Sequence, residues 1–348
     1  AYTLVEGREH FRHRLSLLAH TAEEAGLALQ NFDRSRINAG NASAGPASVV
    51  YMFPGGGAQY LGMAAGLYQQ DADFRADIDQ GLALFQQNRQ YDLKTAWFAS
   101  ADDEQAAREF ERPAIQLPAI FILEMALARL WMRFGVLPDA LLGHSLGENT
   151  AACLAGVLSY EDALGLVSLR GELFEQVTAG AMLSVSLAPT TLEQYLNDEL
   201  CLATINAPEQ CTISGTVAAI EAVQARLADD DIEAQRIPIN VAAHSHLLEP
   251  ILQAFGDYLR SVSLQAPAIP IISNRSGQPL TDTEATDPEY WVQHLRHTVR
   301  FADGVATLAA DKHRVFLEVG PGKVLGSLVR LQQPAFATRV VASLRHPQ

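Results

Sequence analysis

The sequence predicts an α/β fold, with a doubly wound, mostly parallel sheet and a small inserted α+β subdomain. Residues 49 to about 175 and about 242 to 330 alternate short apolar strands with longer helical runs, which is typical of a doubly wound sheet. One of these strands ends in a Gly-x-Ser-x-Gly sequence that continues into a helical segment, as at a sharp strand-to-helix turn. Between the two parts, short strands and helices follow one another more closely.

The region between the two parts contains four short strands. Helices over about 190–199 and 216–230 connect them and give the order β-α-β-β-α-β of a ferredoxin-like unit. The strands are expected at 180–187, 202–206, 211–215 and 234–239. A small inserted subdomain forms a cleft over the main sheet, and ligand sites favour such boundaries.

The Gly-His-Ser-Leu-Gly segment at positions 143–147 carries the predicted nucleophile. Small residues at both ends of this motif let the chain turn sharply, which exposes the hydroxyl of Ser145 above the sheet. The next N–H, that of Leu146, then lies at a helix N-terminus and can face a developing oxyanion. Such a motif also arises by chance in a Gly-rich chain, so the structure expected on either side of it decides whether Ser145 is a nucleophile.

The flanking sequence favours this setting. A helical run over Pro118–Phe134 leads to a turn at Pro138–Asp139 and then to an apolar strand over Ala140–Leu142. Downstream, Asn149–Leu158 is rich in Ala, Cys and Leu, which suits a helix buried against a sheet. Ser145 therefore lies at a strand-helix joint.

A glycine-rich loop follows the predicted strand Ser48–Phe53. The loop has the sequence Pro-Gly-Gly-Gly-Ala-Gln at positions 54–59 and offers unpaired N–H groups. A phosphate-binding Walker loop also needs a lysine and a hydroxyl, which this loop lacks. We expect instead that the N–H of Gly56 is a second oxyanion donor beside Ser145.

Six segments in one order resemble the acyltransferase domains of modular polyketide synthases. These domains are similar to the malonyl-CoA:acyl carrier protein transacylases of fatty acid synthesis. The resemblance covers about residues 49 to 345 and implies a hydrolase-like α/β core. The family usually has Gln where this chain has Gly56, a more mobile residue. The segments are 53–59, 143–148, Arg170, 206–208, 243–245 and 318–322.

The resemblance also assigns a general base, which serine needs because it is a weak nucleophile. His244 occupies the position of the family's catalytic histidine, where the chain re-enters the cleft. Two other histidines among the ten are less suitable as the base. His144 is next to the serine but is expected to point away from it, and His246 is expected at a helix start. In the family a main-chain carbonyl holds the imidazole, and His294 matches the residue that supplies it, so a Ser-His dyad suffices.

Arg170 matches the family's carboxylate-binding arginine. A dicarboxylic acyl group brings a free carboxylate into the cleft, and a planar guanidinium grips it through two parallel hydrogen bonds. The alternative is a helix-surface arginine paired with Glu172 or Glu175.

The resemblance assigns further cleft and specificity positions. Gln59, His144 and Asn206 are expected to line the cleft. The pocket for the substituent on the α-carbon of the acyl group is expected to be lined by Leu146, Val241, Ala242 and Ala243. Leu146 is usual in malonyl-selective members, whereas Ala243 replaces the bulky Phe of malonyl pockets and leaves room. A buried methyl contributes only about 0.8 kcal/mol, so a pocket with this extra room discriminates weakly between the two donors. We therefore expect malonyl-CoA as the preferred donor, with methylmalonyl-CoA as the alternative.

These assignments imply a domain layout. Residues 1–47 resemble part of a ketosynthase-to-acyltransferase linker, with one amphipathic helix from Glu9 to Gly26, and 336–348 are expected to form the following linker. The large catalytic subdomain is expected at 48–178 and 241–335, around the small subdomain at 179–240. No initiator methionine or signal-peptide pattern is present, so the chain looks like a piece of a longer polypeptide.

Composition excludes several classes of function. The net charge of −15 disfavours nucleic acid and anionic membranes as partners, since both need basic patches. The absence of an apolar run of about 18 residues is taken to exclude a membrane span. Cys153, Cys201 and Cys211 are unclustered, as expected of reduced cysteines in a cytosolic enzyme without a metal site. An acidic carrier protein would need a local cationic strip, for which Arg296, His297 and Arg300 are candidates unless they are simply a solvated helix end.

Together these features predict a ping-pong transacylase located in the cytoplasm. Ser145 takes an acyl group from CoA, and the phosphopantetheine thiol of an acyl carrier protein then removes it. No metal or redox cofactor is needed. The partners implied are the carrier protein, malonyl-CoA or methylmalonyl-CoA, and a flanking ketosynthase of the same polypeptide. A serine hydrolase and a catalytically silent scaffold remain the alternatives.

Overall fold

The computed structural model describes residues 11–42, 47–100 and 102–344, and the chain divides into two compact units, 1–48 and 49–348. In the first unit, β1 (His13–Leu17) pairs antiparallel with β2 (Ile37–Asn41), and α2 (Ala22–Gln30) lies between them in the chain. The single helix expected from Glu9 to Gly26 is therefore wrong at residues 13–17, which form β1, whereas residues 22–26 belong to α2. The strand pairing joins residues about 24 positions apart, which local periodicity does not reveal, and Thr21 begins the helix by accepting a hydrogen bond from the N–H of Glu24.

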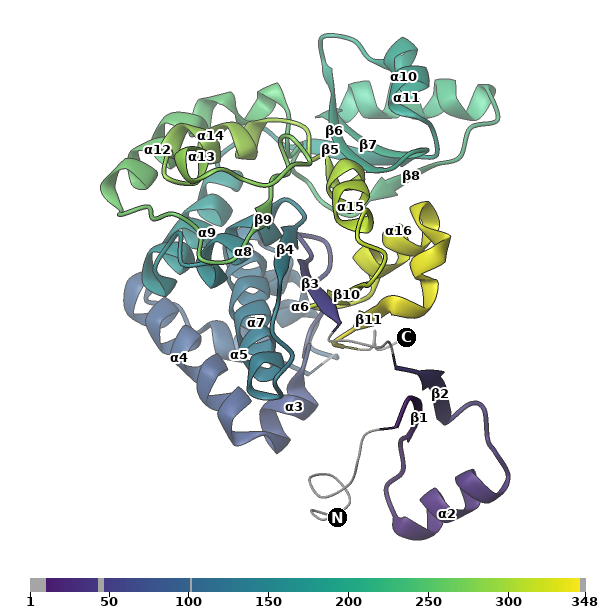
Figure 1. Ribbon diagram of the computed structural model, residues 1–348. Helices are drawn as coiled ribbons and strands as arrows, with labels where there is room; N and C mark the ends of the chain where they lie inside the picture. The colour runs from purple at the N-terminus through teal and green to yellow at the C-terminus, as the bar shows by residue number, and fades with distance from the viewer. Residues whose placement is uncertain (1–10, 43–46, 101, 345–348) are drawn as a thin grey trace. The chain divides into compact units, whose positions relative to one another are not determined.

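The second unit is built on a five-stranded sheet (Figure 1). The strand order is β11-β10-β3-β4-β9, and the β10–β11, β3–β4 and β4–β9 pairs are parallel. The predicted doubly wound, mostly parallel sheet is confirmed. Its strands are β3 (Ser48–Phe53), β4 (Ala140–Gly143), β9 (Ile271–Ile272), β10 (Arg314–Glu318) and β11 (Val340–Ala342).

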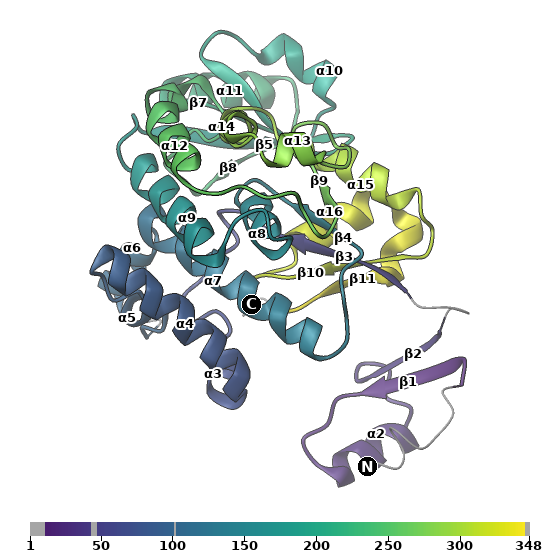
Figure 2. The same cartoon turned by 60° about the vertical axis from the view of Figure 1, so that its left-hand side comes forward.

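Alternate residues of β3 pack into separate cores on the two faces of this sheet. Val49, Tyr51 and Phe53 belong to the larger core, whereas Val50 and Met52 belong to the smaller one, as the two-residue period of a strand requires. Figure 2 shows α8 and α9 on one side of β3 and β4, and α15 and α16 on the other. The larger core includes α4 (Ala72–Arg89), α7 (Pro113–Arg133), α8 (Leu146–Leu154), α9 (Tyr160–Phe174), α12 (Glu249–Ser261) and α14 (Pro288–Arg296), and the smaller core includes α15 (Phe301–Ala309) and α16 (Val324–Gln332).

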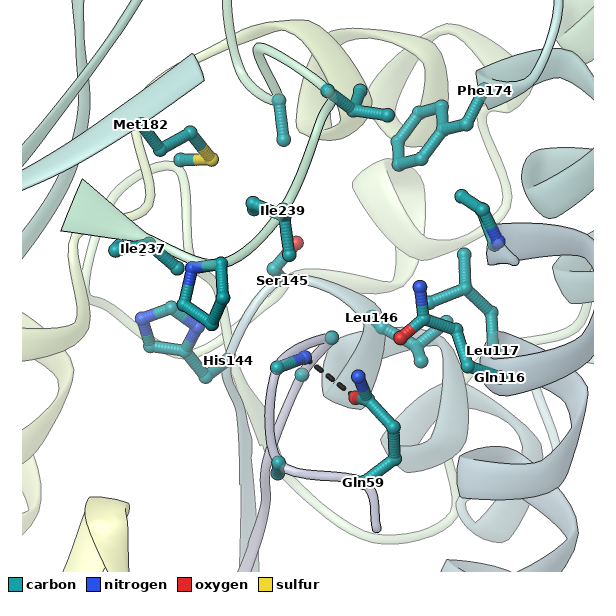
Figure 3. A pocket seen from close by; sticks show the side chains of 18 of the residues that line it. Gln59, Gln116, Leu117, His144, Ser145, Leu146, Phe174, Met182, Ile237 and Ile239 are labelled. Carbon is teal, nitrogen blue, oxygen red and sulfur yellow. Dashed lines mark hydrogen bonds between the residues drawn. The ribbon is translucent and has the colours of Figure 1, made fainter. Parts of the chain in front are cut away.

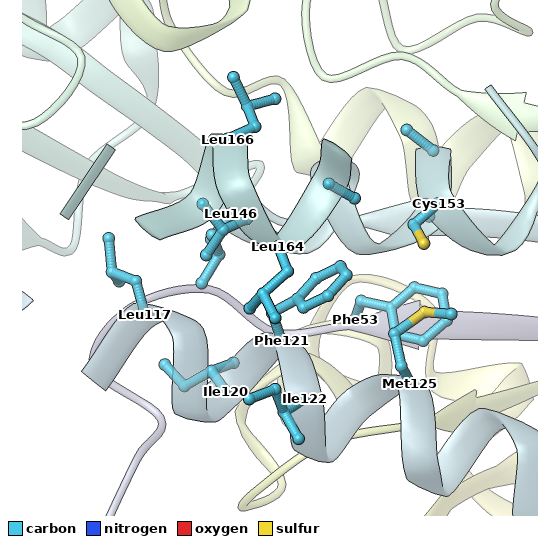
Figure 4. Close-up of a cluster of buried hydrophobic side chains, with 14 of the residues drawn as sticks. Phe53, Leu117, Ile120, Phe121, Ile122, Met125, Leu146, Cys153, Leu164 and Leu166 are labelled. Atoms are coloured by element: carbon cyan, nitrogen blue, oxygen red, sulfur yellow. The ribbon is translucent and has the colours of Figure 1, made fainter. Parts of the chain in front are cut away.

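Helix α7 corrects two expectations. It begins at Pro113, in the first helical position, rather than at Pro118, which lies inside the helix. It is also long and apolar enough to cross a membrane, although no such run was expected from the sequence. Most of this stretch is buried within the protein, and Figure 4 shows its Phe121 in a cluster with Phe53 and Leu164. A helix that is buried on all sides in a protein core is apolar all round, as a membrane-spanning helix is.

The second sheet of this unit has the strand order β6-β7-β5-β8, with antiparallel β6–β7, β7–β5 and β5–β8 pairs. This is the predicted ferredoxin-like arrangement. Its strands are β5 (Gly180–Val185), β6 (Leu200–Ala207), β7 (Gln210–Thr216) and β8 (Ala234–Ile237). Helix α11 (Val217–Asp229) matches one expected helix, but the other is only α10 (Pro189–Leu192) and the 3-10 turn η1 (Glu193–Tyr195). We propose 179–240 as the boundaries of this subdomain.

The C-terminal segment is part of the second unit rather than only a linker. Phe336, in η3 (Pro334–Arg339), is buried in the smaller core, and β11 forms the edge of the main sheet. The helix expected over Asn149–Leu158 also differs, since α8 begins directly after Ser145 and ends at Leu154, before Gly156 adopts a φ of +81°. The remaining short helices are α3 (Ala65–Gln70), α5 (Leu93–Trp97), α6 (Glu104–Phe110), η2 (His246–Leu248) and α13 (Asp282–Ala285).

Candidate active site

Ser145 occupies a sharp turn between β4 and α8. Its backbone has φ 54° and ψ −112°, a conformation that L-residues rarely adopt. The turn requires glycine on both sides, because a Cβ on Gly143 would lie 2.0 Å from the N of Glu148 and a Cβ on Gly147 would lie 2.0 Å from the O of Phe53. The chain thus has the local geometry expected of an exposed nucleophile.

His244 lies beside this serine. The Oγ of Ser145 and the Nε2 of His244 are 2.7 Å apart, although the residues are 99 positions apart in the chain. The imidazole is buried, and burial, with smaller contributions from Arg170 and His144, lowers the pKa of His244 to about 3. The Nδ1 of His244 has no hydrogen-bond partner within the described residues. Main-chain groups of His297 and His294 nearby act against burial and raise the pKa of His244. The ring is therefore neutral at pH 7 and its Nε2 can accept a proton.

Arg170, on α9, directs its guanidinium at the same hydroxyl. One terminal nitrogen donates to the Oγ of Ser145 at 2.8 Å, and the other donates to the Oδ1 of Asn149 at 3.1 Å. The side chain is 2% exposed, its Nε has no hydrogen-bond partner, and no carboxylate pairs with it within the described residues. Burial lowers the pKa of Arg170 to about 10, so the group remains a cation at pH 7.

The alternative role considered for Arg170, a surface ion pair, is wrong. Glu172 pairs with Arg89 instead, and Glu175 pairs with Arg112 at 2.9 Å. Arg170 is thus a buried cation without an acidic partner in the described chain, an arrangement that costs free energy unless a ligand supplies the opposite charge.

Two residues that line the cavity with Ser145 have main-chain N–H groups that are free to donate to an anion. Neither the N–H of Leu146 nor that of Gly56 forms an internal hydrogen bond within the described residues. The glycine loop is pressed against the serine turn, since a Cβ on Gly55 would lie 2.6 Å from the O of His144. Gln59 steadies this loop by accepting a hydrogen bond from the N–H of Gly57 at 2.7 Å (Figure 3).

These groups open into a cavity of about 790 Å³, lined by residues of the small sheet, of helices that include α7, α9 and α16, and of the segments that follow β3, β4 and β8. Figure 3 shows Leu146, Phe174 and Met182 around it. Of the four predicted specificity positions, Leu146, Val241 and Ala243 line the cavity, but Ala242 does not. The Cβ of Ala242 instead faces Gly180 of β5.

His144 lines the cavity, as the sequence predicts. Its Nε2 lies 2.8 Å from the Oδ1 of Asn206 on β6. Burial lowers the pKa of His144, so the neutral ring donates its Nε2–H to this oxygen. The contact links the serine turn to the small sheet, because Asn206 lies on β6. Asn206 also donates to the Oγ1 of Thr212 on β7 at 3.4 Å.

Sequence reasoning missed a buried polar group behind the dyad, formed by Glu148, Ser273, Asn274 and Tyr290. Glu148 directly follows the Gly-x-Ser-x-Gly motif, which is the only local signal. His294 is buried beside this group, with its Nε2 3.9 Å from the Oε2 of Glu148. Burial raises the pKa of Glu148 to about 7, against the lowering effect of hydrogen bonds from Tyr290 and Asn274.

The other predicted features have simpler surroundings. Arg296 pairs with Glu249 at 3.2 Å and Arg300 pairs with Asp303 at 2.7 Å, so much of the charge of the expected cationic strip is neutralised within the chain. All three cysteines are free thiols. Within the part of the chain that the structure describes, no group of three or more His, Cys, Asp or Glu side chains is placed to hold a metal ion.

Comparisons with known proteins show the family to which the chain belongs. The family model of the acyl transferase domain matches residues 50–335. A phenolphthiocerol/phthiocerol polyketide synthase polypeptide of Mycobacterium tuberculosis is 34% identical over 360 residues, which cover 100% of this chain and 24% of that protein. The PKS-NRPS hybrid synthetase acdB of Aspergillus candidus is 37% identical over 333 residues, which cover 93% of this chain and 13% of that protein. The chain thus spans a quarter or less of the length of these relatives.

Solved structures show the same relationship. The acyl transferase domain of ZmaA superposes with a TM-score of 0.92 at 35% identity, covering 100% of this chain and 81% of that one. The malonyl-CoA:acyl carrier protein transacylase FabD of Xanthomonas oryzae has a TM-score of 0.76 at 28% identity, covering 87% of this chain and 96% of that one. The chain therefore belongs to the acyl transferase domain family, and it is an acyltransferase of the type found in modular polyketide synthases.

Proposed function

We propose that this chain transfers a dicarboxylic acyl group, with malonyl preferred, from CoA to the phosphopantetheine thiol of an acyl carrier protein. The observation that carries the proposal is Arg170, a buried guanidinium without an acidic partner in the described chain, whose nitrogen lies 2.8 Å from the Oγ of Ser145. A distal carboxylate on the acyl group supplies the negative charge that Arg170 lacks as a partner, close to the nucleophile. A plain serine hydrolase has no use for such a cation.

The first half of the reaction forms an acyl-serine. The neutral Nε2 of His244 takes the proton of the Ser145 hydroxyl while its Oγ attacks the thioester carbonyl carbon. Collapse of the tetrahedral intermediate breaks the carbon–sulfur bond, and CoA leaves as the thiol with the proton that His244 returns. The N–H groups of Leu146 and Gly56 stabilise the oxyanion.

The second half reverses these steps with a different thiol. His244 takes the proton of the phosphopantetheine thiol, whose sulfur attacks the acyl-serine ester. The carbon–oxygen bond to Ser145 breaks, and the Oγ recovers its proton from His244. The two halves share one site, so the kinetics are ping-pong, and the chain's own residues supply every proton transfer without a resident cofactor.

Malonyl-type substrates are supported by a relative. The acyl transferase domain of SpnD, 38% identical with a TM-score of 0.90 over 99% of this chain and 82% of that one, is described in complex with 2-(pent-4-yn-1-yl)malonyl. In this chain Ala243 leaves room for a substituent, while Leu146 matches the residue usual in malonyl-selective members. We propose malonyl-CoA as the preferred donor, with transfer of methylmalonyl at a measurable rate.

The partners follow from the same proposal. The carrier protein receives the acyl group, and a ketosynthase of the same polypeptide, joined through residues 1–47, uses it in polyketide synthesis. We propose that the chain works in the cytoplasm.

We expect malonyl-CoA to add one malonyl group to Ser145, because the nucleophile, base and carboxylate-binding group converge there. Intact-mass analysis after brief mixing measures the adduct, and Ser145→Ala should abolish it. An adduct that persists in this variant contradicts the mechanism. Adding a carrier-protein thiol should remove the group faster than water does; release mainly to water would instead indicate a hydrolase.

Arg170→Ala should reduce kcat/KM for malonyl-CoA ten- to hundredfold, since hydrogen bonds to charged groups contribute roughly 1.5–3 kcal/mol. Acetyl-CoA, which lacks the distal carboxylate, should lose much less. Arg129→Ala is the control, because Arg129 pairs with Asp77 on another helix and does not line the cavity. Equal losses for the two thioesters would mean that Arg170 only supports the fold.

The imidazole of His244 should remain neutral from pH 8 to pH 5, because burial lowers its pKa to about 3 and a lowered pKa preserves the neutral form as the pH falls. The NMR signal of its Cε1–H, assigned by its loss in His244→Gln, should keep a constant chemical shift over this range. A titration midpoint near the usual histidine pKa of about 6.5 would contradict this burial.

Competition between malonyl-CoA and methylmalonyl-CoA for Ser145 tests the proposed donor. We expect malonyl to be preferred, and Ala243→Phe to reduce methylmalonyl transfer more than malonyl transfer because the ring occupies the space of the methyl group. A preference for methylmalonyl above about tenfold, which corresponds to about 1.4 kcal/mol, would overturn the assignment.

A further inference from the structure

Asn274 grips both sides of the turn that carries Ser145. It lies two residues after β9, and its Oδ1 accepts a hydrogen bond from the N–H of Ser145 at 2.8 Å. Its Nδ2 donates to the carbonyl oxygen of Gly143, also at 2.8 Å. The two contacts fix the orientation of the amide, because only the oxygen can accept from an N–H and only the NH2 group can donate to a carbonyl.

Asn274 is itself held from two directions. Its main-chain N–H donates to the Oε2 of Glu148 at 2.6 Å, and its carbonyl oxygen accepts from the N–H of Arg300 at 2.7 Å. The Oε1 of Glu148 accepts from the hydroxyl of Tyr290. Glu148, Asn274 and Tyr290 are each at most 3% exposed, so water does not compete for these contacts.

The backbone of Ser145 is strained, and the two hydrogen bonds of the Asn274 amide help to hold it in that conformation. At φ 54° the serine lies outside the regions that L-residues favour, so surrounding contacts have to hold it there. The amide of Asn274 takes up the N–H of Ser145, while the next N–H, that of Leu146, stays free toward the cavity. A relaxed turn would move both the Oγ and this N–H.

We infer that Asn274 is a positioning residue for acyl transfer, which holds Ser145 through its Oδ1 and Nδ2 so that the Oγ meets His244 and the N–H of Leu146 faces the oxyanion. The inference rests on the proposed role of Ser145 as the nucleophile. Asn274 does not line the cavity, so it acts through Ser145 rather than on the substrate.

The first test compares Asn274→Ala with Val305→Ala. Val305 is fully buried in the core on the other face of the sheet and does not line the cavity, so its truncation loosens the fold without touching the dyad. Asn274→Ala should lower kcat for malonyl transfer about a hundredfold, the scale of loss expected when a reacting group is misplaced by about 1 Å. Its KM should change less than about twofold, because Arg170 and the cavity are intact. Val305→Ala should lower Tm at least as much while keeping kcat within about twofold.

A fluorophosphonate probe separates this inference from the choice of substrate. The probe reacts with an activated serine whatever acyl group the enzyme prefers, so labelling of Ser145 should also fall about a hundredfold in Asn274→Ala. Wild-type protein that reacts with the probe but not with malonyl-CoA would contradict the proposed function and leave the role of Asn274 intact. Labelling of Asn274→Ala at the wild-type rate, or an equal loss in Val305→Ala, would overturn the inference.

Asn274→Asp gives a signature that a purely structural role does not produce. A protonated Asp can accept from the N–H of Ser145 and donate to the O of Gly143, whereas its carboxylate repels that oxygen. Glu148 on α8 faces this position and favours the protonated form when ionised, whereas Arg275 and Arg300 in the adjoining segments oppose it. His294 and Tyr290 of α14 are neutral and add no charge there. Labelling of Asn274→Asp, relative to wild type, should therefore rise as the pH falls. A ratio that is constant from pH 8 to pH 5 would overturn the inference.

Discussion

The close approach of the serine turn to the end of β3 is the constraint on which the rest of the site depends. Strands β3 and β4 are parallel neighbours, and their carboxyl ends meet where Gly147 passes the carbonyl oxygen of Phe53 without room for a Cβ. The N–H of His144 donates to the same carbonyl at 2.9 Å. This contact brings the glycine loop after β3 beside the serine turn, so that Gly56, Ser145 and Leu146 line the same cavity.

Burial then decides the charge states in the cavity. Desolvation lowers the pKa of both His244 and Arg170, but the consequences differ because their ordinary pKa values differ. The imidazole becomes neutral and can act as a base, while the guanidinium remains charged at pH 7. One apolar setting therefore produces a base and a cation within reach of the same Oγ. The cation also disfavours protonation of the imidazole, which keeps Nε2 available.

The small sheet lines part of the cavity and contacts the serine turn directly. The bond between His144 and Asn206 joins β4 to β6, and the side-chain amide of Gln332, at the end of α16, donates to the carbonyl oxygen of Asn206 at 3.4 Å. A half-buried, neutral imidazole and an amide form this link without adding a charge. The polar contact lies close to Ser145, so changes at Asn206 are expected to affect both the width of the cavity and the serine turn.

The sequence by itself determined the local parts of this protein. The glycines at 143 and 147 specify a turn at Ser145, the three glycines after β3 specify a loop with free N–H groups, and alternating apolar segments specify the parallel sheet and the inserted four-stranded sheet. The roles of His244 and Arg170 came from resemblance to a family, because nothing in their immediate sequence indicates which histidine or arginine meets the serine.

Only the tertiary structure decided contacts between segments far apart in the chain. Asn274 lies 129 positions from Ser145, and the pairing of β1 with β2 replaces an expected helix. Likewise, β11 joins the main sheet where a linker was expected, and α7, apolar enough for a membrane, is the central core helix. In each case the outcome depends on which surface covers a segment. Local periodicity and propensity do not contain that information, because burial and long-range hydrogen bonds arise only when the chain is packed.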